Sequence, residues 1–554
     1  MKEFPHLLSP IKIGSYTYKN RIEAAPTIFA TLALIPHISD RVLRMIEDRA
    51  KGGCASVVNG EIPVNFDDSL RPIIAGEGKV IQVTVDYKNF DDPAFAVFQK
   101  NAAVITKHGA IAIAELSHFG VEKPLLDDGI LPLGPVAYTK EDGTQVRAFD
   151  RESMAKVAND FADAAHFMKA AGFQGVFVHC GHGWMIGQFL SNRNNKRTDE
   201  YGGSIENRAR FPMAILQAIR DRCGADFLIE IRLSGEENLP GGITIDETVA
   251  FCTLLEGTGL VDLIHISAGH YYSPARSHEF STIFTPHGLN ADYAAAVKKA
   301  VGIPVAVVGG ITTPETAERI IAEGKADIVS MGRQMIADPA FAKKAAGGCA
   351  DEIRACIRCC VCYPGPSGEH ETDPVGRHLP GLGSCTINPY NVNSFSHHTI
   401  LPEAMPKPEA SRKVLIVGGG PGGMQAAVDA ADRGHKVILA DKADQLGGIL
   451  RLTDNDFYKK DLREFKDLLV REVGKRDIDV RLHTQVTPKT VREISPNALI
   501  IAIGAEPALP PIPGIEEAVT ALDVYFKPEG TIGNKVVVVG GGLVGCEVGL
   551  ELVH

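Results

Sequence analysis

The sequence contains no long hydrophobic run and no excess of basic residues. No apolar stretch reaches the roughly 20 residues that a membrane-spanning helix needs, and the first residues, Met1 to His6, lack the charged and then apolar start of a secretory signal peptide. The formal net charge is -11, whereas nucleic acids and anionic membranes bind basic surfaces. We therefore expect a cytoplasmic protein that binds neither nucleic acid nor membrane.

Cysteine is scarce along most of the chain and concentrated in one stretch. Two C-x-x-C steps bring Cys356, Cys359 and Cys362 close together, and the more distant Cys385 can complete the ligand shell of a 4Fe-4S cluster. Cys360, between two ligands, is expected to point away. A disulfide and a zinc site are the alternatives, but cytosolic chains seldom keep disulfides, and zinc sites usually pair one C-x-x-C with another. An iron-sulfur site is the favoured interpretation.

The length of 554 residues exceeds what one hydrophobic core supports. The 45% apolar and 23% charged residues are ordinary for a globular protein. Large barrels of about 250 residues occur as one domain, so we expect two large units and a connector. The predicted boundaries are a barrel over residues 1–345, a cluster connector over 346–410, a dinucleotide-binding domain over 411–534, and the start of a further domain over 535–554.

Short β-branched runs alternate with helical patterns eight times before the cysteines. The expected strands are Ile22–Ala25, Ala55–Asn59, Ala112–Leu116, Gly175–His179, Phe227–Arg232, Leu263–Ser267, Val305–Gly309 and Ile328–Met331. The clearest helical stretches between them are Asp91–His108, Arg151–Ala171, Asp246–Gly257 and Pro314–Ala322. Eight such alternations predict an α/β fold of the (β/α)8 TIM-barrel type, in which the residues that follow each strand face the catalytic mouth.

Polar motifs stand where several of these strands end. They include Pro26 and Thr27 after the first strand, Glu115 to Gly120 after the third, and His179-Cys180-Gly181-His182-Gly183-Trp184 after the fourth. The last of these leads into Arg197-Thr198-Asp199-Glu200-Tyr201-Gly202-Gly203. With these motifs the chain resembles the old yellow enzyme family of flavin oxidoreductases. It is most similar to the iron-sulfur branch that includes 2,4-dienoyl-CoA reductase, 2-enoate reductases, trimethylamine dehydrogenase and bacterial bile-acid and steroid ene-reductases.

The ends of the last two strands favour a phosphate site. Gly309 and Gly310 follow the seventh strand, and Gly332 and Arg333 follow the eighth. Glycines there let backbone N–H groups approach a phosphate, and the arginine adds a charge-assisted hydrogen bond. Ordinary barrel turns are the alternative. A phosphate site in a mouth suited to a flavin predicts FMN as the cofactor.

Two further residues of the mouth are assigned by the resemblance. Arg232 is implied to face the N1/O2 edge of the flavin, with a structural ion pair as the alternative. Many relatives carry glutamine where this chain has Glu115. A carboxylate cannot donate a hydrogen bond unless it is protonated. We therefore hypothesise that Glu115 either lowers the flavin potential or has a raised pKa.

The resemblance also implies how the substrate is held. His179 and His182 are expected to hydrogen-bond the carbonyl oxygen of an activated alkene, so that the β-carbon accepts hydride from flavin N5. The α-carbon then needs a proton, and Trp184 stands where many relatives have a tyrosine. We expect Tyr271 to supply the proton, with His270 second and water third. Trp184 is also suited to form a wall for a flat substrate.

A dinucleotide fingerprint opens the second half of the chain. The expected strand Lys413–Val417 leads into Gly418, Gly420 and Gly423, and a second expected strand ends before Asp441. In this arrangement a pyrophosphate binds at a helix N-terminus, and the acidic residue accepts hydrogen bonds from ribose hydroxyl groups. Two further turns, at Gly448 and Gly504, resemble those of two-dinucleotide flavoprotein reductases. By that resemblance this site binds FAD or a bare ADP moiety.

A second fingerprint follows near the end of the sequence. An expected strand over Val536–Val539 leads into Gly540, Gly542 and Gly545, which resemble the NAD(P)H site of the same reductases. Only about one strand and part of a helix precede the last residue, His554, whereas a βαβ unit needs about 30 residues. We expect a truncated NAD(P)H-binding domain that binds NAD(P)H poorly.

These motifs and the resemblance predict an ene-reductase that passes electrons from NAD(P)H through FAD and the cluster to FMN and then to a small α,β-unsaturated carbonyl compound. The expected substrate is an enoate, an enoyl-CoA thioester or a steroid or bile-acid enone, and the steroid or bile-acid enone is the favoured subclass because of Trp184, Tyr271 and Tyr272. One alternative is an amine dehydrogenase, which is disfavoured because Ile28 stands where trimethylamine dehydrogenase has the cysteine that tethers its flavin. The other is an electron-transfer flavoprotein without ene-reductase activity, suggested by Trp184 and Glu115. A homo-oligomer is compatible with the sequence, which does not define the oligomeric state.

Overall fold

The chain forms two compact units, Met1–Ile400 and Leu401–His554, which are described separately. The structure is a computed structural model. It describes residues 3–27, 33–34, 36–65, 73–75, 79–81, 84–123, 129–271, 280–362, 385–388, 407–527 and 531–553.

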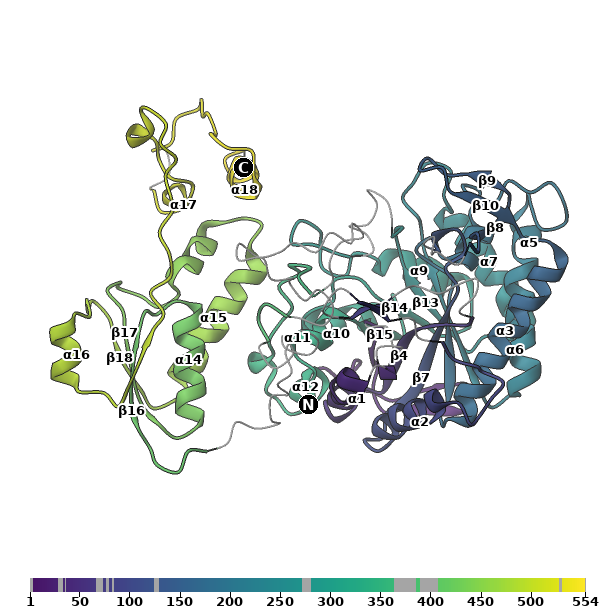
Figure 1. The fold of residues 1–554 in the computed structure, drawn as a ribbon, viewed down its shortest axis with the longest axis horizontal. Helices are drawn as coiled ribbons and strands as arrows, with labels where there is room; N and C mark the ends of the chain where they lie inside the picture. Colours follow the sequence, from purple (N-terminus) through teal and green to yellow (C-terminus); the bar gives the residue numbers. More distant parts are fainter. Residues whose placement is uncertain are drawn as a thin grey trace. The chain divides into compact units, whose positions relative to one another are not determined.

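Eight parallel strands of the first unit close into a barrel, in the order β11-β12-β13-β14-β15-β3-β4-β7 (Figure 1). Their bounds are β3 (Ile22–Ala24), β4 (Ser56–Pro63), β7 (Ile111–Ser117), β11 (Gly175–His179), β12 (Leu228–Ser234), β13 (Leu263–Ser267), β14 (Val305–Val307) and β15 (Ile328–Met331). The predicted TIM barrel is confirmed. One predicted strand is too long: β14 stops at Val307 because Gly309 (φ 147°) and Gly310 (φ 59°) turn the chain away.

Several helices of this unit begin at side chains that cap them. Asp150 opens α3 in a reciprocal capping box with Ser153, and Thr244 does the same for α7 with Glu247. Asp92 caps α2, so that helix begins two residues later than the predicted Asp91. The bounds are α1 (Pro36–Lys51), α2 (Pro93–Thr106), α3 (Arg151–Ala170), α4 (Met185–Leu190), α5 (Ile205–Arg208), α6 (Arg210–Cys223), α7 (Ile245–Thr258), α9 (Ala291–Ala300), α10 (Pro314–Ala322), α11 (Arg333–Ala337) and α12 (Phe341–Ala346).

Several short elements complete the first unit. They are the hairpin β1 (Ile11–Ile13) and β2 (Tyr16–Tyr18), the pair β5 (Ile73–Ala75) and β6 (Lys79–Ile81), the small sheet of β8 (Leu133–Gly134), β10 (Gln145–Ala148) and β9 (Tyr138–Thr139), and the 3-10 helices η2 (Gly120–Glu122) and η3 (Ala350–Glu352). The hairpin supplies buried Ile13 and Tyr18 to the interior core of the barrel, where they pack with Phe177 and Leu228. A larger core fills the layer between strands and helices.

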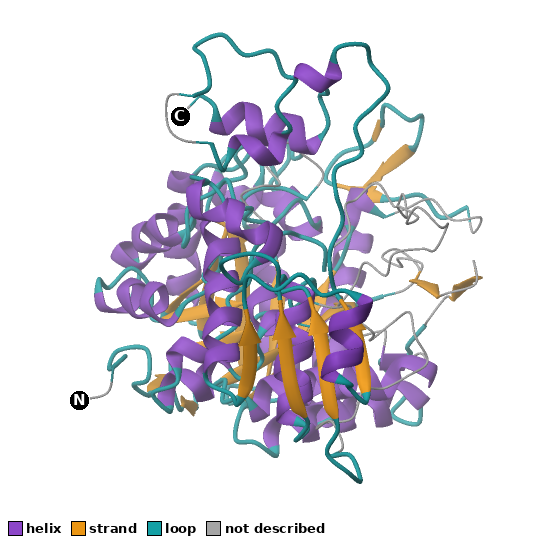
Figure 2. Ribbon diagram, turned by 90° about the vertical axis from the view of Figure 1, so that its left-hand side faces the viewer, coloured by secondary structure: helices purple, strands orange, loops and turns teal. Residues whose placement is uncertain are grey.

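The second unit is built on a four-stranded parallel sheet, whose strands run side by side in the order β18-β17-β16-β19 (Figure 2). Its elements are β16 (Lys413–Val417), α14 (Pro421–Asp432), β17 (Lys436–Ala440), η4 (Gly448–Asn455), α15 (Lys460–Gly474), β18 (Ile478–Arg481), α16 (Pro488–Ile494), β19 (Ala498–Ile501), η5 (Ile515–Glu517), α17 (Ala521–Val524) and α18 (Leu543–Glu551). The predicted Rossmann-like domain is confirmed.

The strand predicted over Val536–Val539 is wrong. These residues have no strand assignment, and the side chains of Val537 and Val539 are 87% and 68% exposed. A strand is defined by pairing with a neighbour, and the described residues supply none here. The glycines and the helix α18 that follow are nevertheless present.

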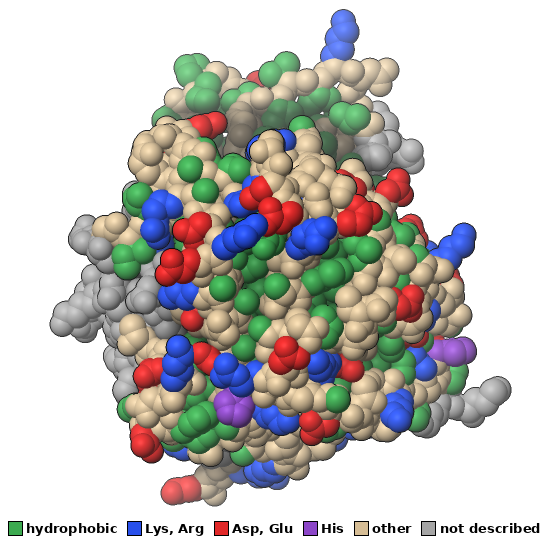
Figure 3. All heavy atoms as spheres, turned by 90° about the vertical axis from the view of Figure 1, so that its right-hand side faces the viewer, with side chains coloured by type: hydrophobic (Ala, Val, Ile, Leu, Met, Phe, Trp, Pro, Cys, Tyr) green, Lys and Arg blue, Asp and Glu red, His purple; other side chains and the backbone are tan. Residues whose placement is uncertain are grey.

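Charged side chains of both signs are interspersed on the face drawn in Figure 3. This mixture accords with a chain in which acidic residues outnumber basic ones, 68 to 57. Among the described helices, none combines the length and the apolar character that crossing a bilayer requires.

Candidate active site

One cavity gathers most of the predicted site residues at the carboxyl ends of the barrel strands. It encloses about 1150 Å³ of space between atoms, part of it open to solvent. Of the predicted residues, its lining contains Pro26, Thr27, Glu115, His179, His182, Trp184, Arg232, Tyr271, Gly309, Gly310, Gly332, Arg333, Cys356 and Cys362. The residues expected around the substrate, around FMN and around the cluster therefore share one space. Ile28 and Tyr272, which also entered the sequence argument, lie outside the described residues.

His179 is the last residue of β11 and is buried, with 5% of its surface exposed. Its Nδ1 accepts a hydrogen bond from the backbone N–H of Gly181 at 3.3 Å, so the ring proton lies on Nε2. Burial, together with the charges of His182 and Arg232, holds the pKa of His179 well below its usual value. His179 is therefore a neutral imidazole with an Nε2–H donor.

His182 lies beside it, with the two rings perpendicular and their centroids 5.1 Å apart. Its Nε2 is 2.8 Å from Oγ of Ser267, which also lines the cavity. Burial, and then the charge of Arg232, lower the pKa of His182 well below its ordinary value. Both histidines are thus neutral hydrogen-bonding groups and not cations.

Aromatic side chains form one wall. Trp184 stacks on Tyr271 with centroids 5.5 Å apart and contacts Phe119 edge to face at 4.8 Å. Phe280 packs against Tyr271 from the other side. Phe119 belongs to the Glu115–Gly120 run but is not part of the cavity lining. Phe280 lines the cavity, and the sequence argument missed it because it belongs to no motif.

The two predicted proton donors lie in different places. Tyr271 lines the cavity, and its backbone N–H donates to the carbonyl oxygen of His182 at 3.0 Å. The ring of His270 packs against Gly183, where an added Cβ would lie 2.2 Å from Nε2, and His270 is not part of the cavity lining. Burial lowers the pKa of His270 to about 4. The geometry therefore favours Tyr271 over His270 as the proton donor.

The glycines at the other end of the cavity have no room for side chains. A Cβ on Gly309 would lie 2.7 Å from Asn290, one on Gly310 2.8 Å from Ser281, and one on Gly332 2.9 Å from Thr27. Bare backbone at these turns fits a bound phosphate. The guanidinium of Arg333 donates to the carbonyl oxygen of Ser281 at 2.7 Å and to its Oγ at 3.0 Å.

Two buried ionisable side chains, Glu115 and Arg232, also line the cavity. Burial and the nearby Glu61 raise the pKa of Glu115 to about 8, against the opposing effect of Arg232. Arg232 lies 4.7 Å above the ring of Phe177. Glu115 is thus a carboxylic acid near neutral pH, which supports the raised-pKa form of the hypothesis. Glu61 also lines the cavity, and sequence reasoning missed it although it is an acid within an apolar strand.

The four predicted ligand cysteines come together. Each of Cys356, Cys359, Cys362 and Cys385 lies close enough to the other three for their charges to interact. Cys360 takes no part in this group, and its Sγ instead accepts from Arg333 at 3.0 Å. All the cysteines lie in the described part of the chain, and each is a free thiol there. Four convergent thiols suit a metal or a cluster.

The first fingerprint of the second unit folds as a phosphate-binding turn. A Cβ on Gly423 would lie 1.8 Å from the carbonyl oxygen of Gly418, and one on Gly448 would lie 2.7 Å from Cα of Gly420. The carboxylate of Asp441 accepts from the backbone N–H groups of Gly419 and of Ala443. The residues therefore fit a dinucleotide phosphate at the start of α14.

The remaining glycines follow the same pattern. Gly504 has a positive φ of 73° after β19. In the second fingerprint, a Cβ on Gly545 would lie 1.9 Å from the carbonyl oxygen of Gly540, which has the same φ of 109° as Gly418. Gly542 caps α18 with the extended backbone that Gly420 has before α14. The two fingerprints thus share one local geometry.

A barrel with this mouth and a fused dinucleotide-binding unit define an oxidoreductase. Residues 6–352 match the model of the NADH:flavin oxidoreductase / NADH oxidase family, and residues 412–554 match that of pyridine nucleotide-disulphide oxidoreductases. The chain belongs to the NADH:flavin oxidoreductase / NADH oxidase family, as the sequence motifs indicate.

Similar proteins cover almost the whole chain. An NADH oxidase of Thermoanaerobacter brockii is 36% identical over 99% of this chain and 81% of its own length. A cinnamate reductase of Clostridium sporogenes is 29% identical over the same shares. The solved complex of 2-naphthoyl-CoA reductase with 2-naphthoyl-CoA has a TM-score of 0.84 at 29% identity and covers 99% of this chain and 81% of that one.

Proposed function

We propose that the protein reduces the C=C bond of an α,β-unsaturated carbonyl compound. The observation that carries this proposal is the neutral Nε2–H of His179 in the cavity that Arg232 and the glycine turns also line. FMN bound in this cavity would supply hydride from N5. The family, with a cinnamate reductase among its similar proteins, supports this choice.

The histidines would polarise the substrate. A hydrogen bond from His179 Nε2–H to the carbonyl oxygen, with His182 and Ser267 beside it, withdraws electron density from the double bond and favours hydride addition at the β-carbon. Because the pKa of each ring is low, the donor stays neutral and keeps its proton. A separate acid must therefore protonate the α-carbon.

Tyr271 is the acid that we assign to this step. It lines the cavity, whereas His270 does not. Trp184, stacked on Tyr271, would hold the substrate against the flavin and exclude water. The remaining alternative for this proton is solvent.

The aromatic wall indicates the substrate class. Trp184, Tyr271 and Phe280 line the cavity and favour a flat conjugated compound. The names of the similar proteins, cinnamate reductase and 2-naphthoyl-CoA reductase, point to an aryl enoate or aryl thioester. A steroid or bile-acid enone is the second candidate, because the same aromatic side chains also suit a flat, bulky substrate.

The electron supply completes the proposal. The cysteine group would hold a 4Fe-4S cluster, and Cys356 and Cys362 line the cavity proposed for FMN. The second unit would bind FAD at the first fingerprint and NAD(P)H at the second. A reduced cluster passes single electrons, so it suits transfer between two flavins.

A product assay tests the proposal. Anaerobic protein, reconstituted with FMN and iron-sulfide and reduced with dithionite, is incubated with cinnamate-like acids, aryl-CoA thioesters and 4-en-3-one steroids. We expect one class to give the saturated product. Flavin reduction by amines, with no alkene reduced, would instead support the amine dehydrogenase alternative; reoxidation only by protein or dye acceptors would support the electron carrier.

A further inference from the structure

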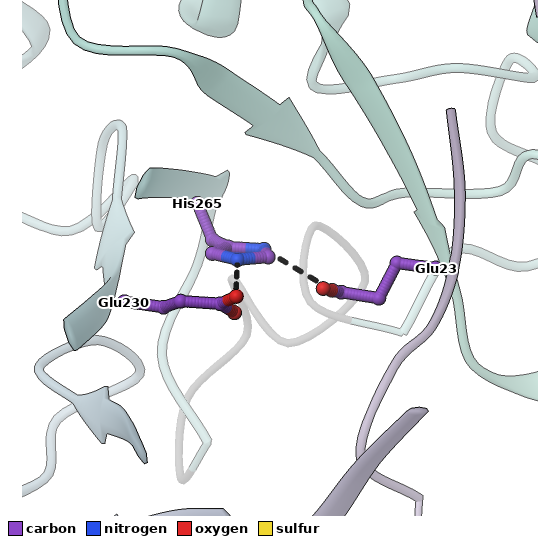
Figure 4. Close-up of side chains that lie close together, drawn as sticks. All are labelled: Glu23, Glu230 and His265. Carbon is purple, nitrogen blue, oxygen red and sulfur yellow. Dashed lines mark hydrogen bonds and ion pairs between the residues drawn. The ribbon is translucent and has the colours of Figure 1, made fainter. Parts of the chain in front are cut away.

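Three ionisable side chains meet inside the barrel, away from the residues assigned above. Glu23 on β3, Glu230 on β12 and His265 on β13 are each at most 1% exposed. Figure 4 shows the imidazole of His265 between the two carboxyl groups. Nε2 lies 3.0 Å from Oε2 of Glu230, and Nδ1 lies 3.4 Å from Oε1 of Glu23. We refer to these three residues as the interior triad.

The two close contacts of the imidazole in the interior triad favour an additional proton. A neutral imidazole carries one N–H, whereas both of its nitrogens face a carboxyl oxygen. If the proton is on Nε2, the lone pair of Nδ1 faces a carboxyl oxygen of Glu23, and the two acceptors repel unless Glu23 is protonated. Nδ1 makes no hydrogen bond within the described structure. With the proton on Nδ1, the contact between Nε2 and Glu230 needs a second proton, because an unprotonated pair there would repel.

The surrounding hydroxyl groups indicate which carboxyl group holds this proton. Ser330 donates to Oε1 of Glu23 at 2.7 Å and Ser56 donates to its Oε2 at 3.0 Å, which stabilises the ionised form. Glu230 receives one such donor, Tyr18, at 2.7 Å. The additional proton therefore resides on Glu230. Burial raises the pKa of Glu230 to about 8 and lowers that of His265 to about 4, in agreement with this assignment.

Other charged groups around the interior triad act in both directions. Arg232, two residues after Glu230 on the same strand, favours the ionised form of Glu230, whereas Asp262 opposes it. Glu115 on β7 and Cys54 before β4 also interact electrostatically with Glu23. The phenol of Tyr18, whose pKa burial raises well above its usual value, stays neutral. The triad thus buries two carboxyl groups, with the positive Arg232 near Glu230, and a retained proton lowers the free-energy cost of burying two negative charges.

Ser330 connects the interior triad to the cavity. It is the partner of Glu23 in the register of β15 and β3, and it also lines the cavity. Ser56 is the partner of Glu23 on the other side, in the register of β3 and β4, and does not line the cavity. The two hydroxyl groups therefore bond the same carboxylate, but only one of them reaches the proposed cofactor site.

We propose that Glu23, His265 and Glu230 hold one exchangeable proton in the barrel interior and that Ser330 passes it to an anionic group bound in the cavity. In the transfer, Nδ1 of His265 gives its proton to Glu23 while Nε2 of His265 takes the proton of Glu230. The hydroxyl group of Ser330 then turns from Glu23 towards the bound group, gives that group its own proton and accepts the proton now held by Glu23. Each bond to hydrogen that breaks is matched by one that forms, and no electron moves. The interior triad ends one charge more negative.

The acceptor is a flavin that has received electrons, so in this respect alone the inference rests on the proposed function. Reduction of the flavin adds negative charge to a buried site, and a proton transferred from the interior triad would neutralise that charge. The interior triad itself is a property of the chain and is measurable without any flavin.

Infrared spectroscopy of the flavin-free protein tests the retained proton. We expect the difference between wild type and Glu230→Gln at pH 7 to contain the C=O band of a buried carboxylic acid, and this band to disappear from wild type as the pH rises through about 8. Glutamine preserves the shape of Glu230 and can donate to Nε2, so the variant should fold. Loss of only a carboxylate band would overturn the proposal, as would a non-iron metal ion bound once per wild-type chain and absent from Glu230→Gln.

Stopped-flow reduction of the FMN-loaded protein with a pH indicator tests the link through Ser330. We expect Ser330→Ala to slow the protonation that accompanies flavin reduction by about 10-fold or more, and the matched variant Ser56→Ala to leave it unchanged. Equal rates in both variants would overturn the assigned path. If the protein binds no flavin, the proposed function fails, whereas the infrared band of Glu230 remains.

Discussion

At the scale of single residues, burial determines the chemistry of the cavity. His179 and His182 remain neutral and Glu115 remains protonated near neutral pH because each lies in a site where charge is poorly solvated. A protonated Glu115 can donate and accept hydrogen bonds, which is what glutamine does at this position in many relatives. The presence of glutamate instead of glutamine at position 115 thus alters the pH dependence of the site more than its shape.

Glu115→Gln should change how stability depends on pH. The folded-state pKa of Glu115 is raised to about 8, above its unfolded value of about 4.3. Its contribution is complete below the unfolded pKa and is lost as the pH rises through 8, at up to about 1.4 kcal/mol per pH unit. We expect urea unfolding of the apoprotein to show a smaller loss of stability between pH 5 and pH 8 in Glu115→Gln. An unchanged pH dependence would show that Glu115 ionises normally.

Tyr271→Phe should slow protonation of the α-carbon by about 10²-fold or more, because general acid catalysis typically contributes 10² to 10⁴. Flavin binding and substrate binding should change little, since the ring that stacks on Trp184 is kept. Single-turnover kinetics in ¹H₂O and ²H₂O measure the step. His270→Ala is the comparison variant, and a larger effect there would assign the proton to His270.

At the scale of elements, the ends of strands and helices place the functional groups. The strands were predictable because each is a nearly continuous apolar run, buried on both faces by the barrel core and the helices. The site residues at the end of a strand, such as His179, were predictable for the same reason. The interior triad was not predicted, because its members come from three strands with no shared spacing. The signal available was a charged residue between apolar neighbours, as in Ile22-Glu23-Ala24 and Ile229-Glu230-Ile231.

Gly423→Ala should disrupt the first fingerprint. An added Cβ would lie 1.8 Å from the carbonyl oxygen of Gly418, so the first turn of α14 must move away from β16. We expect FAD binding to fall by at least 10-fold. The neighbouring Gly422→Ala, whose Cβ would meet nothing within 4 Å, is the control in the same turn. Equal affinities of both variants, measured by flavin fluorescence, would argue against dinucleotide binding at this helix.

At the scale of the whole molecule, the cysteine group and the barrel mouth share a cavity through Cys356 and Cys362. The grouping of Cys356, Cys359 and Cys362 was predictable from C-x-x-C spacing, and Cys385 was expected to join them from further along the chain. The contact of Cys360 with Arg333 was not predictable, since it joins segments distant in sequence. The strand expected over Val536–Val539 failed because a run of valines specifies an extended strand only where a neighbouring strand pairs with it.

Cys356→Ser should remove most of the iron from anaerobically purified protein, because a cubane cluster needs its four thiolate ligands. Cys360→Ser should retain it. Iron and acid-labile sulfide analysis, supported by electron paramagnetic resonance of the reduced protein, measures both. Zinc at one ion per chain in the wild type would instead identify the site as a zinc centre.

The most direct measurement is a single turnover at the proposed flavin site. The FMN-loaded protein is reduced with dithionite under anaerobic conditions and mixed with cinnamate or an aryl-CoA thioester, while flavin absorbance is recorded and the product is analysed. The account predicts rapid flavin reoxidation with one equivalent of saturated product, slowed by about 10-fold or more in His179→Gln. A reduced flavin that no unsaturated carbonyl compound reoxidises would contradict it.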